Sequence, residues 1–284
     1  MFGSFSNSWR LIKASANILN TNKSLLIYPF VSAIASIIVI ISFFVPLAVS
    51  GLIEKLDKSS GAPVIAIGVS FLFYVVLYTV IFFCNTALVG SALMMLRGGN
   101  PTVSDGFSIA RERLSSIVGY AMIAATVGMV LRAISERSGI VGRIISGILG
   151  FAWTVATFLV VPILVIEKAD PLEAIKRSAA LLRQTWGEQL VGSFSMGSIF
   201  GLLMVGIIIL GGMLVGGLAT ALNSVAVGVL GVLAIVLAIV LIGLYSSALQ
   251  GIYTAALYEY AAQGKVSDTF DADLITNAFK RKNG

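Results

Sequence analysis

The chain has 284 residues, of which 58% are hydrophobic and 11% are charged, and it contains no histidine and one cysteine. A soluble domain carries about 25% charged residues, so this composition excludes a soluble globular protein. With one cysteine the chain cannot form an internal disulfide, and without histidine it lacks the ligands of Cys/His metal sites. No cofactor is expected. The net charge of +6 is typical of loops beside anionic lipid, which makes membrane lipid, not nucleic acid, the expected partner.

Long uncharged intervals divide the chain into membrane spans. A bilayer core needs roughly 20 apolar residues per helix. The first apolar run is about twice as long as the core of a signal peptide, so we expect it to stay in the protein as a membrane anchor. We therefore predict an all-α polytopic membrane helix bundle that forms a single integral membrane domain over residues 1–284. Its six spans are expected at about 25–53, 63–96, 114–131, 144–166, 189–219 and 225–258.

The segment "MFGSFSNSWRLIKASANIL" (1–19) precedes the first span. Its apolar residues recur at helical spacing, while Arg10 and Lys13 lie elsewhere around the helix. This pattern predicts an amphipathic helix ahead of span 1.

The second span contains "VIFFCNTAL" (80–88), which places polar side chains inside an apolar run. Cys84 is expected to be a packing residue. Asn85 and Thr86, together with Gln250 in the sixth span, are the candidates for a polar path through the membrane, because buried polar groups are costly in hydrocarbon. Hydrogen bonds between helices are the alternative role for these three side chains.

"NPTVSDGFSIARERLSSIVGY" (100–120) repeats the amphipathic pattern ahead of span 3, and it begins with a capping residue followed by Pro101. Prolines also lie inside spans, among them Pro46 in the first and Pro162 in the fourth. Proline removes a backbone donor and can kink a helix. The two prolines therefore indicate one of two things: a static kink, or a broken helix that forms a substrate site.

"ADPLEAIKRSAALLRQTWGE" (169–188) separates spans 4 and 5. Asp170 as N-cap, Pro171 and Glu173 predict a capped helix. Its helical spacing predicts an interfacial helix ahead of span 5, either in the membrane interface or against the end of the bundle; an ordinary loop helix shares this geometry. The residues that define it are Leu172, Ile175, Lys176, Leu182, Arg183 and Trp186.

The last uncharged interval, 189–258, is long enough for two or three spans. "TALNS" (220–224) is its clearest turn signal and favours two. Small residues at four-residue spacing predict close helix contacts, within the bundle or between subunits of a homo-oligomer. This helix-packing stripe consists of Gly197, Gly201, Gly212, Gly216, Gly243, Ser247, Gly251 and Ala255.

Basic residues predict the orientation of the spans. With the N-terminus inside, fourteen Lys and Arg residues lie on the inner side and five on the outer side. Both termini are therefore expected in the cytoplasm. A seventh span would place the basic C-terminal tail outside instead.

Two segments carry a resemblance to a known family. "SWRLIKASANILNTNKSLLIYP" (8–29) and "DPLEAIKRSAALLRQTWGE" (170–188) resemble an uncharacterised prokaryotic multi-pass membrane protein family, a domain of unknown function. The chain is more loosely similar to the membrane domain of glycerophosphodiester phosphodiesterases and to Yip-type proteins. The resemblance implies a six-helix fold with cytoplasmic helices in a prokaryotic plasma (inner) membrane. No phosphodiesterase residue carries over to this sequence.

Catalysis has no support in the sequence. Histidine is absent, the carboxylates are peripheral, and hydroxyl-rich segments such as "VGSFSMGS" (191–198) have no base to activate them. We expect a non-catalytic integral membrane protein whose cytoplasmic amphipathic helices engage lipid or a partner. The alternative is a channel or carrier for a small neutral or lipidic solute. The absence of ionisable residues deep in the spans narrowly favours the first function.

The predicted orientation can be tested by cysteine labelling. In a Cys84→Ala background, a cysteine introduced at Lys176 should be protected from a membrane-impermeant maleimide in intact cells, because 167–188 is expected in the cytoplasm. Labelling of this cysteine from outside would refute the orientation.

Overall fold

The computed structural model describes residues 2–49, 62–186 and 195–263, and the elements within these ranges are helices without a strand. The predicted all-α class is confirmed. In chain order the elements are α1 (Phe2–Thr21), the 3₁₀ helix η1 (Lys23–Leu26), α2 (Ile27–Val49), α4 (Ala62–Leu96), α5 (Val103–Glu112), α6 (Leu114–Arg137), α7 (Gly139–Ala156), α8 (Val160–Ile166), α9 (Pro171–Trp186), α11 (Ser195–Ala221) and α12 (Val225–Gln263).

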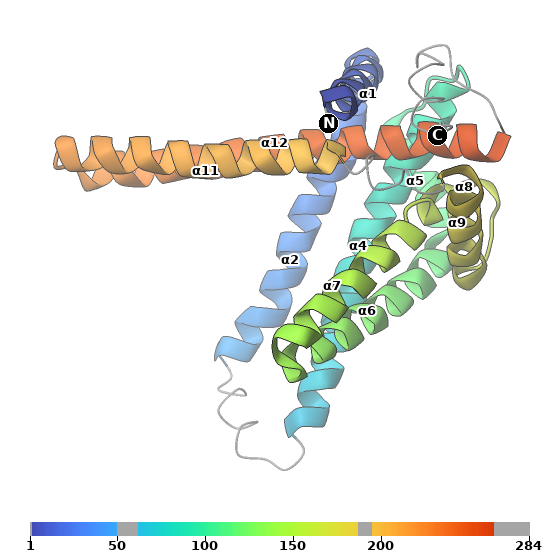
Figure 1. Cartoon of the computed structure of the whole chain (residues 1–284), viewed down its shortest axis with the longest axis horizontal. Coiled ribbons are helices and arrows are strands. Elements are labelled where there is room, and N and C mark those ends of the chain that lie inside the picture. Colours follow the sequence, from blue (N-terminus) through green and yellow to red (C-terminus); the bar gives the residue numbers. More distant parts are fainter. Residues whose placement is uncertain (1, 50–61, 187–194, 264–284) are drawn as a thin grey trace.

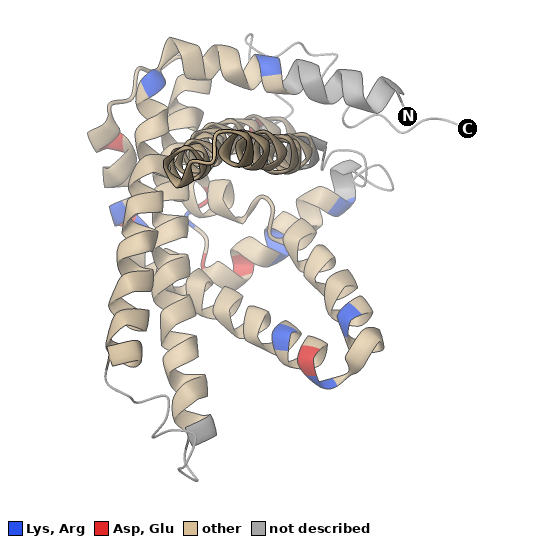
Figure 2. Ribbon diagram, turned by 90° about the vertical axis from the view of Figure 1, so that its left-hand side faces the viewer, with Lys and Arg blue, Asp and Glu red and all other residues tan. Residues whose placement is uncertain are grey.

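Six stretches of the described chain are long and apolar enough to cross a membrane, with mean hydropathies from 1.9 to 3.2. The chain is therefore a multi-pass membrane protein. Figure 2 shows that charged residues are found mainly on the short helices and near the ends of the long ones. The six candidate membrane spans are Lys23–Val49, Val64–Leu96, Leu114–Arg137, Gly139–Ile166, Ile199–Ala221 and Val225–Ala262.

Two helices run beyond their expected ends and include paired charges there. α6 continues to Arg137, and within it Arg132 forms an ion pair with Glu136 at 2.7 Å, one helical turn away. α12 continues to Gln263 and carries Glu259, which pairs with Arg97 of α4 at 2.6 Å. The interval after 189 contains two helices within its described part, α11 and α12, which meet at a turn where Asn223 has a φ of 47°. The turn expected at "TALNS" is thus present.

The long helices do not form one parallel bundle. Figure 1 shows α11 and α12 as a hairpin that runs crosswise to α2 and α4 and projects to one side of them. The C-terminal half of α12 is buried, with Leu249 and Ile252 at 0% exposure, whereas Leu230 and Leu237 of its N-terminal half are 66% and 59% exposed. The hairpin therefore projects from the other helices with its apolar side chains outward. In this arrangement the six helices cannot all lie parallel to the normal of one flat bilayer.

The buried core lies where one end of α2, α4, α6 and α8 meets the C-terminal half of α12, and we call this region the core end. Short helices complete it: α1 packs on α12, α5 on α4, and α9 on α8 and α7. The Asn22 side chain donates a hydrogen bond to the Pro101 carbonyl at 3.3 Å and joins two of these segments. Apolar core residues of the core end include Leu25, Leu88, Leu93, Ile117, Leu164, Leu249 and Ile252.

The N-terminus of α5 has a capping box two residues after the expected position. Thr102, not Asn100, is the N-cap, and its hydroxyl accepts a hydrogen bond from the Asp105 amide at 3.3 Å while the Asp105 carboxylate accepts one from the Thr102 amide at 2.8 Å. The hydrogen bonds from the Thr102 amide and hydroxyl lower the pKa of Asp105. This contribution to stability is present above the pKa of the unfolded state and is lost as pH falls through the folded pKa.

Tyr28 of α2 holds α5 against α4. Its hydroxyl lies 2.7 Å from the Ser91 hydroxyl and 3.3 Å from the Val103 carbonyl, and its ring packs edge-on against Phe107 with centroids 5.2 Å apart. A Cβ added at Gly106 would collide with the Tyr28 and Ser91 hydroxyls. Glycine is therefore required where α5 crosses this pair.

Gly106→Ala should destabilise the protein by about 1–3 kcal/mol, the usual cost of overpacking a close contact. Thermal unfolding in detergent measures the change. Gly147→Ala on α7 is the matched control, because no heavy atom lies within 4 Å of an added Cβ there and alanine is favoured over glycine in a helix. If the two variants were equally stable, α5 would not be docked as described.

Candidate functional site

The fourth span is broken toward its C-terminal end, between α7 and α8. Pro162 lacks an N–H to donate to the Phe158 carbonyl, and its ring crowds that carbonyl, so the helix cannot continue regularly. The chain instead forms a turn over 157–159, in which Leu159 is fully buried. The proline in the first span has no such effect, since α2 runs continuously through Pro46. Of the two prolines, only Pro162 coincides with a break.

α9 satisfies a backbone group that the break exposes. The Leu159 amide donates a buried hydrogen bond to the Ser178 hydroxyl at 3.0 Å. Ser178 is itself 0% exposed. An unpaired amide at this depth would cost the full desolvation penalty of the group, so α9 stabilises the irregular backbone of the fourth span.

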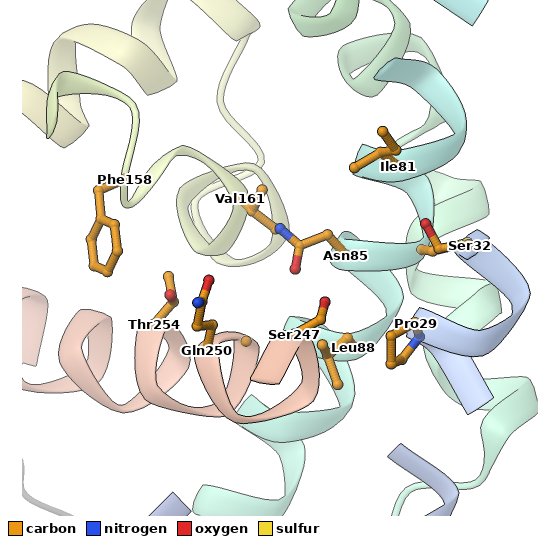
Figure 3. A pocket seen from close by; sticks show the side chains of 12 residues that line it. Pro29, Ser32, Ile81, Asn85, Leu88, Phe158, Val161, Ser247, Gln250 and Thr254 are labelled. Atoms are coloured by element: carbon orange, nitrogen blue, oxygen red, sulfur yellow. The ribbon is translucent and has the colours of Figure 1, made fainter. Parts of the chain in front are cut away.

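The break borders a cavity of about 270 Å³ between α2, α4, α8 and α12 (Figure 3). None of its lining residues carries a formal charge, and several offer hydroxyl or amide groups. The polar lining residues are Ser32, Asn85, Ser247, Gln250 and Thr254, and the apolar ones include Phe158 and Val161. The cavity therefore combines hydrogen-bonding groups with apolar walls, as small-molecule sites do.

Helical periodicity explains how α4 and α12 build the cavity. α4 contributes Ile81, Cys84, Asn85 and Leu88, and α12 contributes Ser247, Gln250, Gly251 and Thr254. Both sets follow the spacing i, i+3, i+4, i+7, which places four residues on one face of a helix. The two faces meet at the core end.

The amides of Asn85 and Gln250, named from the sequence, meet at this cavity. Figure 3 shows both side chains directed toward it from different helices. The Gln250 amide donates a long hydrogen bond, 3.5 Å, to the Ser246 hydroxyl, whereas the Asn85 amide makes none with the described residues. An amide has two donor hydrogens and an acceptor oxygen. The cavity thus holds hydrogen-bonding capacity that a ligand can use.

Thr86 does not belong to this site. It neighbours Asn85 in sequence, but its side chain is 0% exposed and is absent from the cavity lining. Its hydroxyl has no hydrogen-bond partner among the described residues. Sequence reasoning also missed Ser32 and Thr254 as lining residues. Thr254 continues the spacing of Ser247 and Gln250 and could have been found by periodicity.

The predicted small-residue stripe divides into two parts. Gly251 is a close contact: an added Cβ would lie 2.8 Å from Leu88 Cγ. Ala255 is fully buried, and Ser247 lines the cavity. An added Cβ would reach only ordinary contact distance, 3.7 Å, at Gly197 and Gly243, and nothing within 4 Å at Gly201, Gly212 and Gly216. The last three make no close contact with other described residues, because they face outward on the projecting hairpin. The subunit interface remains a prediction for them.

The segment predicted to be an interfacial helix forms α9, but its buried face differs from the predicted stripe, and its place in a membrane interface stays a prediction. Leu182 is 2% exposed and Ile175 half-buried, while Leu172 is 62% exposed. Lys176 and Arg183 are exposed as expected, and the side chain of Trp186 lies outside the described residues. The buried face is formed by Ala174, Ser178, Leu181 and Leu182. Packing on α8 and the Ser178 hydrogen bond orient the helix this way and turn Leu172 outward.

The chain matches a known sequence family. Residues 64–268 match the sequence model of DUF6159, a family of unknown function. The match covers more than half of the chain and includes α4, α8 and α12 of the cavity. No curated protein matches significantly.

Ser178→Ala should destabilise the protein by about 1–3 kcal/mol, because it leaves the buried Leu159 amide without an acceptor. Ser146→Ala is the control: the Ser146 hydroxyl is exposed and donates to the Arg143 carbonyl. Chemical or thermal unfolding of both variants in detergent measures the difference. A loss no larger for Ser178→Ala than for Ser146→Ala would show that the break does not depend on α9.

Proposed function

The chain belongs to the DUF6159 family of unknown function, and we propose that it is a non-catalytic membrane protein that binds a small uncharged polar or lipidic solute and carries it across the bilayer. The site is the cavity between α2, α4, α8 and α12. The observation that carries the proposal is the convergence of the Asn85 and Gln250 amides on this cavity. The function is the alternative from the sequence, and the geometry favours it over a scaffold.

The uncharged lining supports a neutral solute. A charged solute would require an opposite charge or several oriented dipoles to replace its hydration. The cavity offers three hydroxyls and two amides instead. These groups can donate to and accept from a solute such as an amide, a polyol or the polar part of a lipid.

The broken helix supports movement of the solute. Irregular backbone inside a membrane is tolerated where it is buried in protein or lines a cavity, and many transporters bind their substrates beside discontinuous helices. Phe158, in the turn that interrupts the fourth span, lines the cavity together with Val161 of α8. A change at the break would therefore alter the cavity wall directly.

The lining residues support binding and not catalysis. Cys84 and the three lining hydroxyls have no base among the other lining residues that could activate them. We therefore retain the proposal that the protein is not an enzyme. The prokaryotic inner membrane and the cytoplasmic position of both termini also remain proposals, supported by the distribution of Lys and Arg. The loose similarity to phosphodiesterase membrane domains and Yip-type proteins stays a prediction.

A second role, engagement of lipid by the short helices, is favoured by the outer face of α9. Leu172 is 62% exposed there, and Lys176 and Arg183 are exposed as well. An exposed leucine flanked by cations suits the boundary between acyl chains and lipid phosphates. This role is compatible with solute binding, because it uses the opposite face of α9 from Ser178.

The proposed function predicts solute-dependent flux in proteoliposomes. Protein-containing vesicles should equilibrate glycerol, urea or acetamide faster than empty vesicles in a stopped-flow light-scattering assay. Asn85→Leu and Gln250→Leu should each weaken solute binding roughly 2- to 12-fold, the equivalent of one lost net hydrogen bond.

Thr86→Val is the matched control for both variants, because Thr86 neighbours Asn85 on α4 but does not line the cavity. Its flux should equal that of the unchanged protein. Flux of all three probes no faster than in empty vesicles, or an equal loss in Thr86→Val, would contradict the proposal.

A further inference from the structure

A second cavity lies at the core end, away from the first, and the proposed function does not use it. Its volume is about 200 Å³, and it opens between the C-terminal end of α4, the junction of α5 and α6, and the C-terminal end of α8. Three cationic side chains and one carboxylate line it: Arg97, Arg113, Lys168 and Glu112. The two cavities share no lining residue.

Two of the three cations have no counter-ion in the described part of the chain. Arg97 binds Glu259 through Nε at 2.8 Å and Nη2 at 2.6 Å. This pair leaves the guanidinium Nη1 available, and the Arg97 side chain is 45% exposed. Arg113 and Lys168 form no ion pair with another described residue. The cavity therefore has an excess of positive charge that is suited to an anion.

The backbone holds Lys168 in an unfavourable conformation at this cavity. Its φ is 54°, in the left-handed region where glycine or asparagine usually ends a helix. A lysine in this position costs free energy. A cation is favoured near the C-terminus of a helix, but that preference does not require a lysine in the left-handed conformation. A role of the Lys168 side chain at the cavity explains why lysine is found at this position.

The rest of the lining is apolar, which distinguishes a lipid from a free anion. Leu93, Met94, Ile109, Val165 and Ile166 form the walls below the charged residues. The cavity sits where the membrane-spanning helices α4 and α8 end, so its cations lie at the depth of lipid phosphates. A phosphate on the cations and an acyl chain against the apolar walls would satisfy both parts of the lining.

We propose that the cavity lined by Arg97, Arg113 and Lys168 binds the phosphate group of an anionic phospholipid. Such a lipid would join α4, the α5–α6 junction and α8 at one point. The site differs from the outer face of α9, because neither Lys176 nor Arg183 lines it.

Titration of the purified full-length protein with phosphatidylglycerol in detergent, followed by thermal unfolding, tests the proposal. Phosphatidylglycerol should raise the melting temperature, while phosphatidylcholine and inorganic phosphate at equal concentrations should not. Arg113→Gln should weaken the phosphatidylglycerol dependence about fivefold, as expected for one cation beside a phosphate. Arg143→Gln, an exposed arginine on α7 outside the cavity, should leave it unchanged.

Lys168→Gly separates binding from folding. Glycine adopts a φ of 54° without strain, so the lipid-free variant should be at least as stable as the unchanged protein, yet its affinity for phosphatidylglycerol should fall about fivefold. Unchanged affinity in both Arg113→Gln and Lys168→Gly would overturn the proposal. An equal effect of phosphatidylcholine would do so as well. An equal effect of inorganic phosphate would show that the site takes a free anion and would overturn the assignment to lipid.

Discussion

Gly251 lets α12 lie against Leu88 of α4, and the uncharged cavity depends on this crossing. A Cβ at position 251 would collide with the Leu88 side chain, in a part of α12 where Leu249 and Ile252 are fully buried. The crossing also places the Asn85 and Gln250 faces opposite each other. About two helical turns further along α12, the same helix pair brings Glu259 to Arg97. The Arg97 side chain at the second cavity is therefore oriented by α12, which also lines the first cavity.

The break in the fourth span is the second constraint, and it connects the short helices to the membrane helices. Pro162 makes a regular helix impossible, and the turn that results would leave the Leu159 amide unpaired without Ser178. α9 is therefore a structural part of the core end, with its polar outer face directed away. This division of one helix into a structural face and a charged face explains why its sequence looks like that of a soluble helix although it packs against membrane spans.

The sequence predicts the helical class and the number of candidate spans well, because both depend on the length of uncharged runs. It also identifies Asn85 and Gln250, since an amide in an apolar run stands out in composition. It does not define the surroundings of Leu172, Gly212 and Gly216, because these depend on how helices far apart in the chain are oriented; a subunit interface at the two glycines stays a prediction. Helical spacing defines which residues share a face but not which face is buried; the Ser178 hydrogen bond and the crossing at Gly251 decide that. Charge-based boundaries fail at Glu259 for a related reason, since its partner, Arg97, is 162 residues away.

α12 joins the projecting hairpin to the core end through one continuous helix. The helix is continuous over 39 residues from Val225 to Gln263, about 58 Å at the usual rise of 1.5 Å per residue, and it contains no proline at which it could bend. Among the described residues its outer half packs mainly on α11, while its inner half carries the cavity residues. Because the helix is continuous, a tilt of the outer arm would also reorient Ser247, Gln250 and Thr254 relative to α4. The orientation of the hairpin and the shape of the uncharged cavity are therefore connected through the continuous backbone of α12.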